Sequence, residues 1–378
     1  MSRQQISGAV LRHSASPRPY PHSAPLTVES LYLDPPQAHE VRVRIAAAGL
    51  CHSDLSVIDG NRPRPLPMLL GHEAAGVVVE LGEEVHDLAV GDQVVFAFVP
   101  SCGHCLPCQT GRPALCEPGA AANGAGVLID GGSRLRDESG AKVHHHLGVS
   151  AFADHAVVSR RSLIRVDASV PAAVAALFGC AVMTGVGAIA NTGRLRLGES
   201  VLVTGLGGIG FAAVLGALAG GASTVVAADV SDAKLEQARA LGAQHVINVR
   251  DAQAIEHVRD ATHGGADLGL ECAGVVEALE FTYRATRRGG RTVTAGLPPA
   301  SSQLALSPVQ LVAEERSLQG SYLGGCVPVR DIPAYIALYQ SGRLPIDRLL
   351  THELPLSDIN TGFERLAAGN AIRQVIRW

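Results

Sequence analysis

The chain has 378 residues, of which 47% are hydrophobic and 17% charged, and its formal net charge is −4. Single cores stop growing below this length, so we expect two packed domains and little disorder. The charges form no basic stripe, which argues against nucleic acid or an anionic membrane as partner and favours a small molecule. The first ten residues lack the apolar core of a secretory signal, so we expect a cytoplasmic protein whose clustered cysteines bind metal or react.

Hydrophobic patterning changes along the chain. From about residue 30 to 100, short β-type runs such as EVRVRIAAAG alternate with Pro and Gly turns, which predicts an antiparallel or barrel-like β region. Residues 119–146 are rich in Gly and Ala and then charged, so we expect a long excursion with little structure. From about residue 183, strand-like and helix-like runs alternate, which predicts a parallel, doubly wound sheet. The C-terminal IRQVIRW has the β character of a strand that returns to the first domain.

Two uncharged stretches, 168–193 and 201–228, are long enough to span a membrane. Both are dominated by Gly and Ala, and the second begins like a strand, breaks at a glycine cluster and resumes like a helix. We interpret it as a strand, a turn and a buried helix, and we expect no membrane span.

A nucleotide-binding pattern follows the strand-like VLVT. GLGGIG supplies Gly205, Gly207 and Gly210 in G-x-G-x-x-G spacing, and Asp229 ends the next strand-like run. The glycines alone also fit a turn, but the flanking strand and helix and the acidic residue complete a dinucleotide fingerprint. The pyrophosphate would lie at the helix N-terminus and Asp229 would bind the ribose hydroxyls, which favours NAD over NADP. Lys234 is either beside this ribose or a solvated helix residue.

Three separated residues form a candidate metal site. Cys51 stands in GLCHSD, His72 in GHEAAG and Cys180 in FGCAVMTG. Two thiolates and one imidazole leave the fourth position of a tetrahedral zinc open, which is typical of a catalytic site, although each cysteine alone also fits an apolar filler. Asp54 and Glu73 adjoin these residues, where a carboxylate would take the free N–H of a ligating histidine or would be an ordinary surface acid.

A second candidate metal site lies within fifteen residues and has the spacing C-x2-C-x2-C-x7-C. Four thiolates close around one ion and leave no open position, so we predict a structural zinc and two zinc ions per chain. We interpret the remaining thiols, Cys272 and Cys326, as core or half-buried residues. The four predicted ligands of the structural zinc are Cys102, Cys105, Cys108 and Cys116.

On these motifs the chain resembles the zinc-dependent alcohol dehydrogenases of the medium-chain dehydrogenase/reductase superfamily over nearly its whole length. The long 119–146 segment is similar to that of the long-chain, animal-type and class III-like branch. HHHLGVSAFADHAVV also carries the resemblance, and we expect a loop role for its histidine triplet rather than a metal site, because consecutive residues cannot all face one ion. The family's zinc signature is matched at each fixed position, namely Gly71, His72, Glu73, Gly76, Gly82 and Val85.

The resemblance implies an α/β fold in two domains. A GroES-like, β-rich catalytic domain that binds zinc would comprise residues 1–182 and 324–378. A Rossmann NAD-binding domain with a doubly wound parallel sheet would comprise residues 183–323. The family also implies a homodimer formed through edge strands of the nucleotide domains.

Roles for individual residues follow from the same resemblance. Zinc acts as a Lewis acid on the alcohol, hydride passes to the nicotinamide, and Ser53 beside the alcohol oxygen passes the proton on. The relay often ends at a histidine three positions further on, where this chain has Ser56, so its exit is open. His146 stands where the family commonly has an apolar residue. The resemblance further implies phosphate contacts for His52 and Arg373, a nicotinamide contact for Thr184, and substrate-pocket walls formed by Phe98, His146 and Leu297.

The predicted function is NAD-dependent interconversion of a primary or aromatic alcohol and its aldehyde. An alternative is oxidation of a thiol–formaldehyde adduct, an S-hydroxymethyl thiol. The segment EPGAAANGAG after Cys116 lacks the arginine with which that class holds the glutathione carboxylate, but a different thiol remains open. A non-enzymatic zinc-binding protein is the alternative from another class, and the lack of a basic patch argues against its binding nucleic acid.

Overall fold

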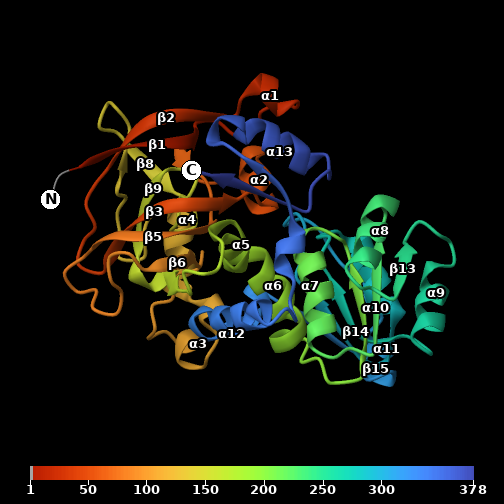
Figure 1. The fold of residues 1–378 in the computed structure, drawn as a ribbon. Helices are drawn as coiled ribbons and strands as arrows, with labels where there is room; N and C mark the ends of the chain where they lie inside the picture. Colours follow the sequence, from red (N-terminus) through yellow and green to blue (C-terminus); the bar gives the residue numbers. More distant parts are fainter. Residues whose placement is uncertain (1–2) are drawn as a thin grey trace. The chain divides into compact units, whose positions relative to one another are not determined.

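The computed structural model describes residues 3–378, and the chain folds into two compact units (Figure 1). Unit 1 comprises Met1–Cys180, Val327–Pro333 and Leu350–Trp378, and unit 2 comprises Ala181–Cys326 and Ala334–Leu349. The sequence analysis places Ala334–Leu349 in the first domain, but in the structure this segment groups with unit 2. Its apolar residues, such as Leu344 and Ile346, are buried, and the Arg348 guanidinium donates to the Ala240 carbonyl at 2.6 Å.

Unit 1 contains two β systems. One is a closed barrel with strand order β1-β2-β7-β8-β4, and the other is a 7-stranded sheet with order β10-β6-β5-β3-β18-β17, in which β9 also pairs with β3. The strands are β1 (Gln4–Leu11), β2 (Leu26–Leu33), β3 (Glu40–Gly49), β4 (Met68–Leu69), β5 (Glu73–Leu81), β6 (Gln93–Phe96), β7 (Leu135–Arg136), β8 (Lys142–His145), β9 (His155–Ser159), β10 (Leu163–Arg165), β17 (Leu350–Leu354) and β18 (Arg373–Arg377).

Apolar side chains fill the barrel of unit 1, as alternating strands require. One buried cluster joins residues from β1, β2, β4, β7, β8 and β9, including Leu31, Leu69 and Val143. The helices of unit 1 are short and connect the strands. They are α1 (Tyr20–Ser23), α2 (His52–Ile58), α3 (Leu106–Gln109), α4 (Glu117–Ala125), α5 (Ala172–Leu177) and α13 (Ile359–Ala367), with 3-10 turns η1 (Pro113–Leu115), η2 (Arg160–Ser162) and η7 (Leu356–Asp358).

The expectation of little structure over 119–146 is wrong. Most of α4 lies in this segment, and β7 and β8 supply two barrel strands. The alanine-rich EPGAAANGA favours a helix. Pro118 stands in its first turn, and Gly126 ends it in the left-handed conformation. The two short strands are fixed by pairing with β2 and β4 rather than by their own sequence.

The C-terminal strand returns to the first unit, as predicted. β18 pairs antiparallel with β3, and Val375 faces Gly49 across the pair. The C-terminus therefore lies in the same sheet as the segment that leads to Cys51.

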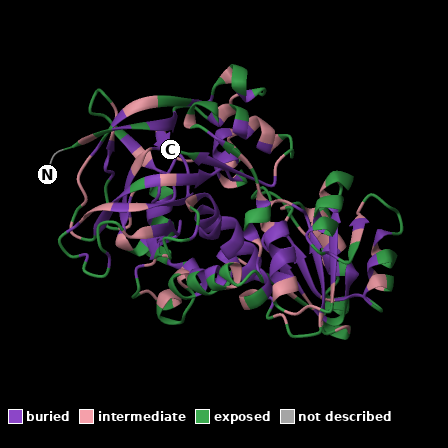
Figure 2. Cartoon of the chain, in the orientation of Figure 1, coloured by how far each residue is buried: buried purple, intermediate pink, exposed green. Residues whose placement is uncertain are grey.

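A long apolar helix runs over Ala172–Thr192 and passes from unit 1 into unit 2. It joins α5, a π-helical turn η3 (Phe178–Val182), α6 (Met183–Gly187) and a second π-helical turn η4 (Ala188–Thr192). Its length and composition would allow a membrane span, but 94% of its apolar window is buried inside the protein, as in a core helix. Figure 2 colours α5 and α6 as buried.

Unit 2 carries a 6-stranded parallel sheet in the order β13-β12-β11-β14-β15-β16. The chain reverses direction across the sheet between β11 and β14, which is the switch point at which doubly wound folds bind dinucleotides. The predicted parallel sheet is thus confirmed. Its strands are β11 (Ser200–Thr204), β12 (Thr224–Asp229), β13 (His245–Asn248), β14 (Ala266–Glu271), β15 (Thr286–Thr294) and β16 (Ser317–Gly320).

Helices lie beside this sheet and cover its apolar strands (Figure 1). One buried cluster joins Val258 of α9 and Ala285 of α10 to Leu202 and Val226 of the sheet. The uncharged 201–228 stretch forms β11, α7 and most of β12, as predicted. The helices are α7 (Gly208–Ala219), α8 (Asp232–Ala240), α9 (Ala254–Ala261), α10 (Val276–Ala285) and α11 (Pro308–Ala313), with α12 (Pro328–Gln340) beginning in unit 1 and turns η5 (Leu323–Gly325) and η6 (Ile346–Leu349).

Candidate active site and zinc centres

Strand register in unit 1 brings two of the separated zinc-ligand candidates together. β3 and β5 pair antiparallel with Gly49 opposite Glu73. Cys51 follows the end of β3 by two residues, and His72 precedes β5 by one residue. Both therefore lie at the same end of this strand pair. Cys180 reaches them from the π-helical turn η3, a kind of irregularity that is frequent at functional sites.

Gly71 fixes the approach of His72. Its φ is +93°, and a Cβ placed there would lie 2.6 Å from the backbone nitrogen of Phe152. The chain needs glycine at this position both for its conformation and for the close passage of the Phe152 backbone.

The three ligand atoms fit a zinc ion. Cys51 Sγ lies 3.9 Å from Cys180 Sγ, and Cys180 Sγ lies 3.5 Å from His72 Nε2. With Zn–S bonds of about 2.3 Å, a tetrahedral site separates two sulfur ligands by about 3.8 Å. All three residues are buried. Two thiols and one imidazole converge here, and among the described residues no fourth His, Cys, Asp or Glu joins this group, which matches a catalytic zinc site.

Asp54 lies behind His72, on the side away from the thiols. His72 Nδ1 is 3.1 Å from Asp54 Oδ1, which also accepts the Gly71 N–H at 3.1 Å. Burial opposes ionisation of this carboxyl, but the neighbouring His72 and His146 side chains hold its pKa well below the usual range. A carboxylate here orients the histidine so that Nε2 faces the thiols.

Glu73 forms an ion pair with Arg373 at the same end of the β3–β5 strand pair. Arg373 Nη2 donates to Glu73 Oε2 at 3.1 Å, and Nη1 donates to the Leu50 carbonyl at 3.4 Å. Burial raises the pKa of Glu73 to about 7, although the Arg373 charge opposes this rise. In the described part of the chain, Arg373 Nε and Glu73 Oε1 are buried without a hydrogen-bond partner.

Phe98 and His146 pack against the His72 ring. The Phe98 centroid lies 5.0 Å and the His146 centroid 5.6 Å from that of His72, both edge to face. Both side chains are buried, and His146 Nε2 is 3.3 Å from Asp54 Oδ1. The contact of His146 with Asp54 is an arrangement that the sequence did not predict. The pocket role of both residues stays a prediction.

The relay candidates lie on α2, which begins directly after Cys51. Ser53 is half-buried, and His52 is exposed at the first position of the helix. Ser56 Oγ donates to the His52 carbonyl at 2.9 Å. The Ser56 hydroxyl therefore bonds to a carbonyl one turn earlier in its own helix.

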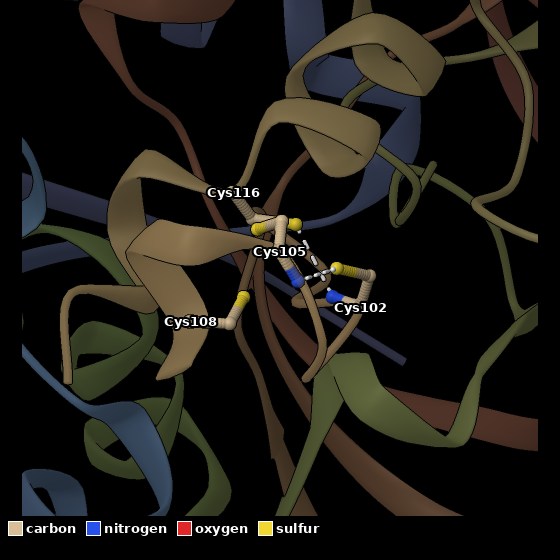
Figure 3. A group of neighbouring side chains, drawn as sticks. All are labelled: Cys102, Cys105, Cys108 and Cys116. Atoms are coloured by element: carbon tan, nitrogen blue, oxygen red, sulfur yellow. Dashed lines mark hydrogen bonds between the residues drawn. The ribbon is translucent and has the colours of Figure 1, made fainter. Parts of the chain in front are cut away.

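The cysteine lobe of unit 1 gathers four thiols. The sulfurs of Cys102, Cys105, Cys108 and Cys116 lie within 4.8 Å of one another, and Figure 3 shows the four side chains grouped on one short loop and helix. Backbone N–H groups point at two of the sulfurs, with Cys102 N 3.1 Å from Cys116 Sγ and Cys105 N 3.3 Å from Cys102 Sγ.

These contacts favour a thiolate at Cys102, whereas burial raises the pKa of Cys108 to about 12 and raises that of Cys116 above its usual value. Burial disfavours ionisation of Cys102, but hydrogen bonds from the backbone of His104 and Cys105 lower its pKa to about 6. Four thiolates that close around one point have the chemistry of a structural zinc site.

The candidate cofactor residues of unit 2 surround the turn after β11. Asp229 Oδ2 accepts the Leu206 N–H at 2.7 Å, and Oδ1 accepts the Ser231 N–H at 3.0 Å. A Cβ on Gly210 would meet the Gly205 carbonyl, so α7 can approach the turn only with glycine there. Gly207 caps the N-terminus of α7. Asp229 thus anchors the turn that leads into α7, and its contact with a ribose stays a prediction.

The other predicted cofactor and pocket residues are spread over both units. Lys234 is half-buried on α8, Thr184 is buried in α6, and Leu297 is 54% exposed, all in unit 2. His52 and Arg373 belong to unit 1. Their assembly around one cofactor stays a prediction.

Known families match both units. The model of the alcohol dehydrogenase GroES-like domain matches residues 37–168, and the zinc-binding dehydrogenase model matches residues 208–341. A curated relative, alcohol dehydrogenase class-3 of Drosophila melanogaster, is 37% identical over 360 residues, which are 94% of each chain.

Solved structures agree with these matches. An alcohol dehydrogenase zinc-binding domain protein from Burkholderia ambifaria has a TM-score of 0.94 at 33% identity, covering 100% of this chain and 99% of its own. Benzyl alcohol dehydrogenase from Acinetobacter calcoaceticus has a TM-score of 0.92 at 30% identity, covering 99% of both chains. The predicted α/β fold, with a GroES-like and a Rossmann-type part, and the predicted NAD and zinc cofactors are confirmed. The chain belongs to the zinc-dependent alcohol dehydrogenases of the medium-chain dehydrogenase/reductase superfamily.

Proposed function

We propose that this enzyme transfers hydride between NAD and a primary or aromatic alcohol or its aldehyde. The observation that carries the proposal is the three-ligand site of Cys51, His72 and Cys180, with ligand distances that suit zinc and an aromatic ring, Phe98, packed against its histidine. The structural similarity to a benzyl alcohol dehydrogenase supports the aromatic end of this substrate range.

Cys51, His72 and Cys180 hold the catalytic zinc in this proposal. When bound, zinc supplies a Lewis acid that polarises the alcohol oxygen, and NAD supplies the hydride acceptor. Asp54 keeps the His72 ring oriented with Nε2 toward the thiols. Glu73 balances the buried charge of Arg373 beside the site. Phe98 packs edge to face with the His72 ring and so excludes water from their contact.

The alcohol proton passes to the Ser53 hydroxyl on α2. The family's histidine is replaced by Ser56, which has no titratable group near neutral pH and donates to the His52 carbonyl. We therefore propose that the proton leaves from Ser53 to solvent or to another group rather than through position 56.

The proposed cofactor residues include those around the turn between β11 and α7 in unit 2. Asp229 and Lys234 bind the adenosine ribose, while Gly205, Gly207 and Gly210 admit the pyrophosphate to the N-terminus of α7. Val230 follows Asp229 in place of the arginine that a 2′-phosphate would need, which supports NAD. Contacts to the phosphates by His52 and Arg373, and to the nicotinamide by Thr184, complete the proposed set. The catalytic domain is proposed as residues 1–182 and 324–378, and the NAD domain as 183–323.

We propose a homodimer that forms through the β16 edge of the unit 2 sheet. β16 is the last strand of the sheet and is largely exposed, and the neighbouring helix α11 presents Val309 and Val312 at 70% and 77% exposure. An unpaired strand edge beside exposed apolar side chains suits pairing with a second copy. A Val312→Glu variant should shift the mass measured by light scattering from dimer to monomer, whereas an unchanged dimer would contradict this surface.

We propose a cytoplasmic location because six of the seven proposed zinc ligands are cysteine thiols, which must stay reduced to bind the two zinc ions. All eight cysteines of the described chain are free of disulfides. This chemistry suits a reducing compartment.

The test of the proposed function is a panel of primary, secondary and aromatic alcohols and aldehydes, assayed with NAD and with NADP. Primary or aromatic substrates should give the highest kcat/KM, and NAD should exceed NADP. Formaldehyde is assayed with and without an added low-molecular-weight thiol, because activity that requires the thiol would instead support the adduct as substrate. No turnover with any alcohol would contradict the proposal.

A further inference from the structure

His146 lies against the carboxylate that orients the zinc-ligating histidine. Its side chain is 2% exposed, its Nε2 is 3.3 Å from Asp54 Oδ1, and its ring contacts His72 edge to face. In the described part of the chain, both ring nitrogens of His146 and Oδ2 of Asp54 are buried without a hydrogen-bond partner. An unpartnered ring nitrogen of His146 thus lies 3.3 Å from a carboxylate oxygen, Asp54 Oδ1, and buried polar groups rarely stay unpaired without a role.

The negative charge on Asp54 determines which hydrogen-bond donors this carboxylate needs. If His72 binds zinc through Nε2, its proton sits on Nδ1 and is donated to Asp54, so Asp54 must remain an anion. The carboxylate is fully buried, and burial of an anion costs free energy unless donors surround it. Its donors are the Gly71 N–H and His72 Nδ1. His146 lies close enough to donate a further hydrogen bond to Asp54 through its Nε2–H.

We propose that His146 is a positioning residue that donates Nε2–H to Asp54 and thereby strengthens the hold of His72 on the catalytic zinc. The inference rests on the proposed zinc-ligand role of Cys51, His72 and Cys180. An apolar residue, which is common at this position in the resembled family, would leave Asp54 with one donor fewer. The carboxylate would then be a weaker acceptor for the His72 Nδ1–H.

A different arrangement is tested by the same experiment. Asp54, His72 and His146 also place one ligand atom each within 4.8 Å of one another, so they form a geometric group of their own. A metal there would use His72 Nδ1 and would add a third zinc to the chain. Three zinc ions per chain in the wild type would overturn the positioning role.

The test compares His146→Phe and His146→Leu, which remove the donor, with His146→Gln, whose Nε2–H₂ restores one at similar reach. His145→Gln is the matched control, because His145 is a buried neighbour that accepts the Arg134 N–H through Nε2 and lies on the barrel side. The first readout is the rate at which the catalytic zinc passes to a chromophoric chelator. The second is the visible absorption of the enzyme with cobalt in the catalytic site.

Loss of an outer donor typically weakens metal binding about 10- to 100-fold, so His146→Phe and His146→Leu should release zinc about 10-fold faster or more. His146→Gln and the control should stay within about 3-fold of the wild type, since each keeps the Asp54 contacts it needs. The cobalt bands should shift in the apolar variants and return in His146→Gln. Folded apolar variants with wild-type zinc release and wild-type bands would overturn the inference. One zinc per wild-type chain would instead overturn the proposed function.

Discussion

Replacing Gly71 by alanine should damage the catalytic zinc site without touching a zinc ligand. The backbone of Gly71 is held on both sides, because its N–H donates to Asp54 Oδ1 and its carbonyl accepts the Ala151 N–H at 3.0 Å. An alanine Cβ would lie 2.6 Å from the Phe152 nitrogen, so one of these segments must move. His72 follows directly and would move with it.

The size of the effect can be separated into two contributions. Gly71 has φ +93°, and a non-glycine residue in such a conformation costs about 1–3 kcal/mol. Forcing a methyl group into a packed position costs about 1–3 kcal/mol more. Gly91 is the matched control, since its φ is +99° and nothing lies within 4 Å of an added Cβ. Gly71→Ala should therefore lose about 2–6 kcal/mol and Gly91→Ala about 1–3 kcal/mol of the free energy of unfolding.

The assay is urea unfolding followed by the fluorescence of Trp378, the one tryptophan of the chain, which lies in unit 1 directly after β18. Zinc content and alcohol turnover are measured on the folded variants. Gly71→Ala should fall below Gly91→Ala in stability and should lose the catalytic zinc. Equal stability of the two variants, with both zinc ions and full activity retained in Gly71→Ala, would refute the claim that the close passage of Phe152 fixes His72.

Three further predictions concern separate parts of the chain. Cys116→Ser removes the acceptor of the Cys102 N–H and a ligand of the structural zinc, so metal analysis should give one zinc per chain and thermal inactivation should accelerate; two retained zinc ions would argue against the four-thiol site. Asp229→Ala should lower kcat/KM for NAD about 10- to 100-fold, the usual worth of hydrogen bonds to a charged group, while NADP is affected less; an equal loss with both cofactors would count against a ribose contact. Burial lowers the pKa of His145 to about 3 from a usual 6.5, so stability is complete above pH 6.5 and falls as pH drops toward 3. The stability difference between wild type and His145→Gln should consequently shrink by about 1 kcal/mol between pH 6.5 and 5.5 in urea unfolding, and a pH-independent difference would contradict a neutral buried His145.

Features that are local in the sequence could be predicted from it. The turn after β11 and the four-cysteine lobe each lie within a few consecutive residues, so spacing alone indicates their chemistry. The alternation of strands and helices after residue 183 likewise predicted the parallel sheet of unit 2. Cys51, His72 and Cys180 needed the family resemblance as well, because the register of β3 against β5 brings the first two together and no local pattern encodes it.

Contacts between distant residues could not be predicted. Arg373 and Glu73 are 300 positions apart and meet because β18 pairs with β3. The contact of His146 with Asp54 depends on the path of the chain after β8. The barrel strands β7 and β8 were missed because tertiary pairing, rather than their own short sequences, determines them.

The central claim is that a zinc ion held by Cys51, His72 and Cys180 performs the NAD-linked alcohol chemistry. The most direct measurement is zinc per chain together with alcohol turnover for the wild type, Cys51→Ser and the control Cys272→Ser, a thiol outside both clusters. We predict two zinc ions and turnover for the wild type and the control, and one zinc ion without turnover for Cys51→Ser. Turnover by Cys51→Ser at the wild-type rate, or one zinc ion in the active wild type, would contradict the account.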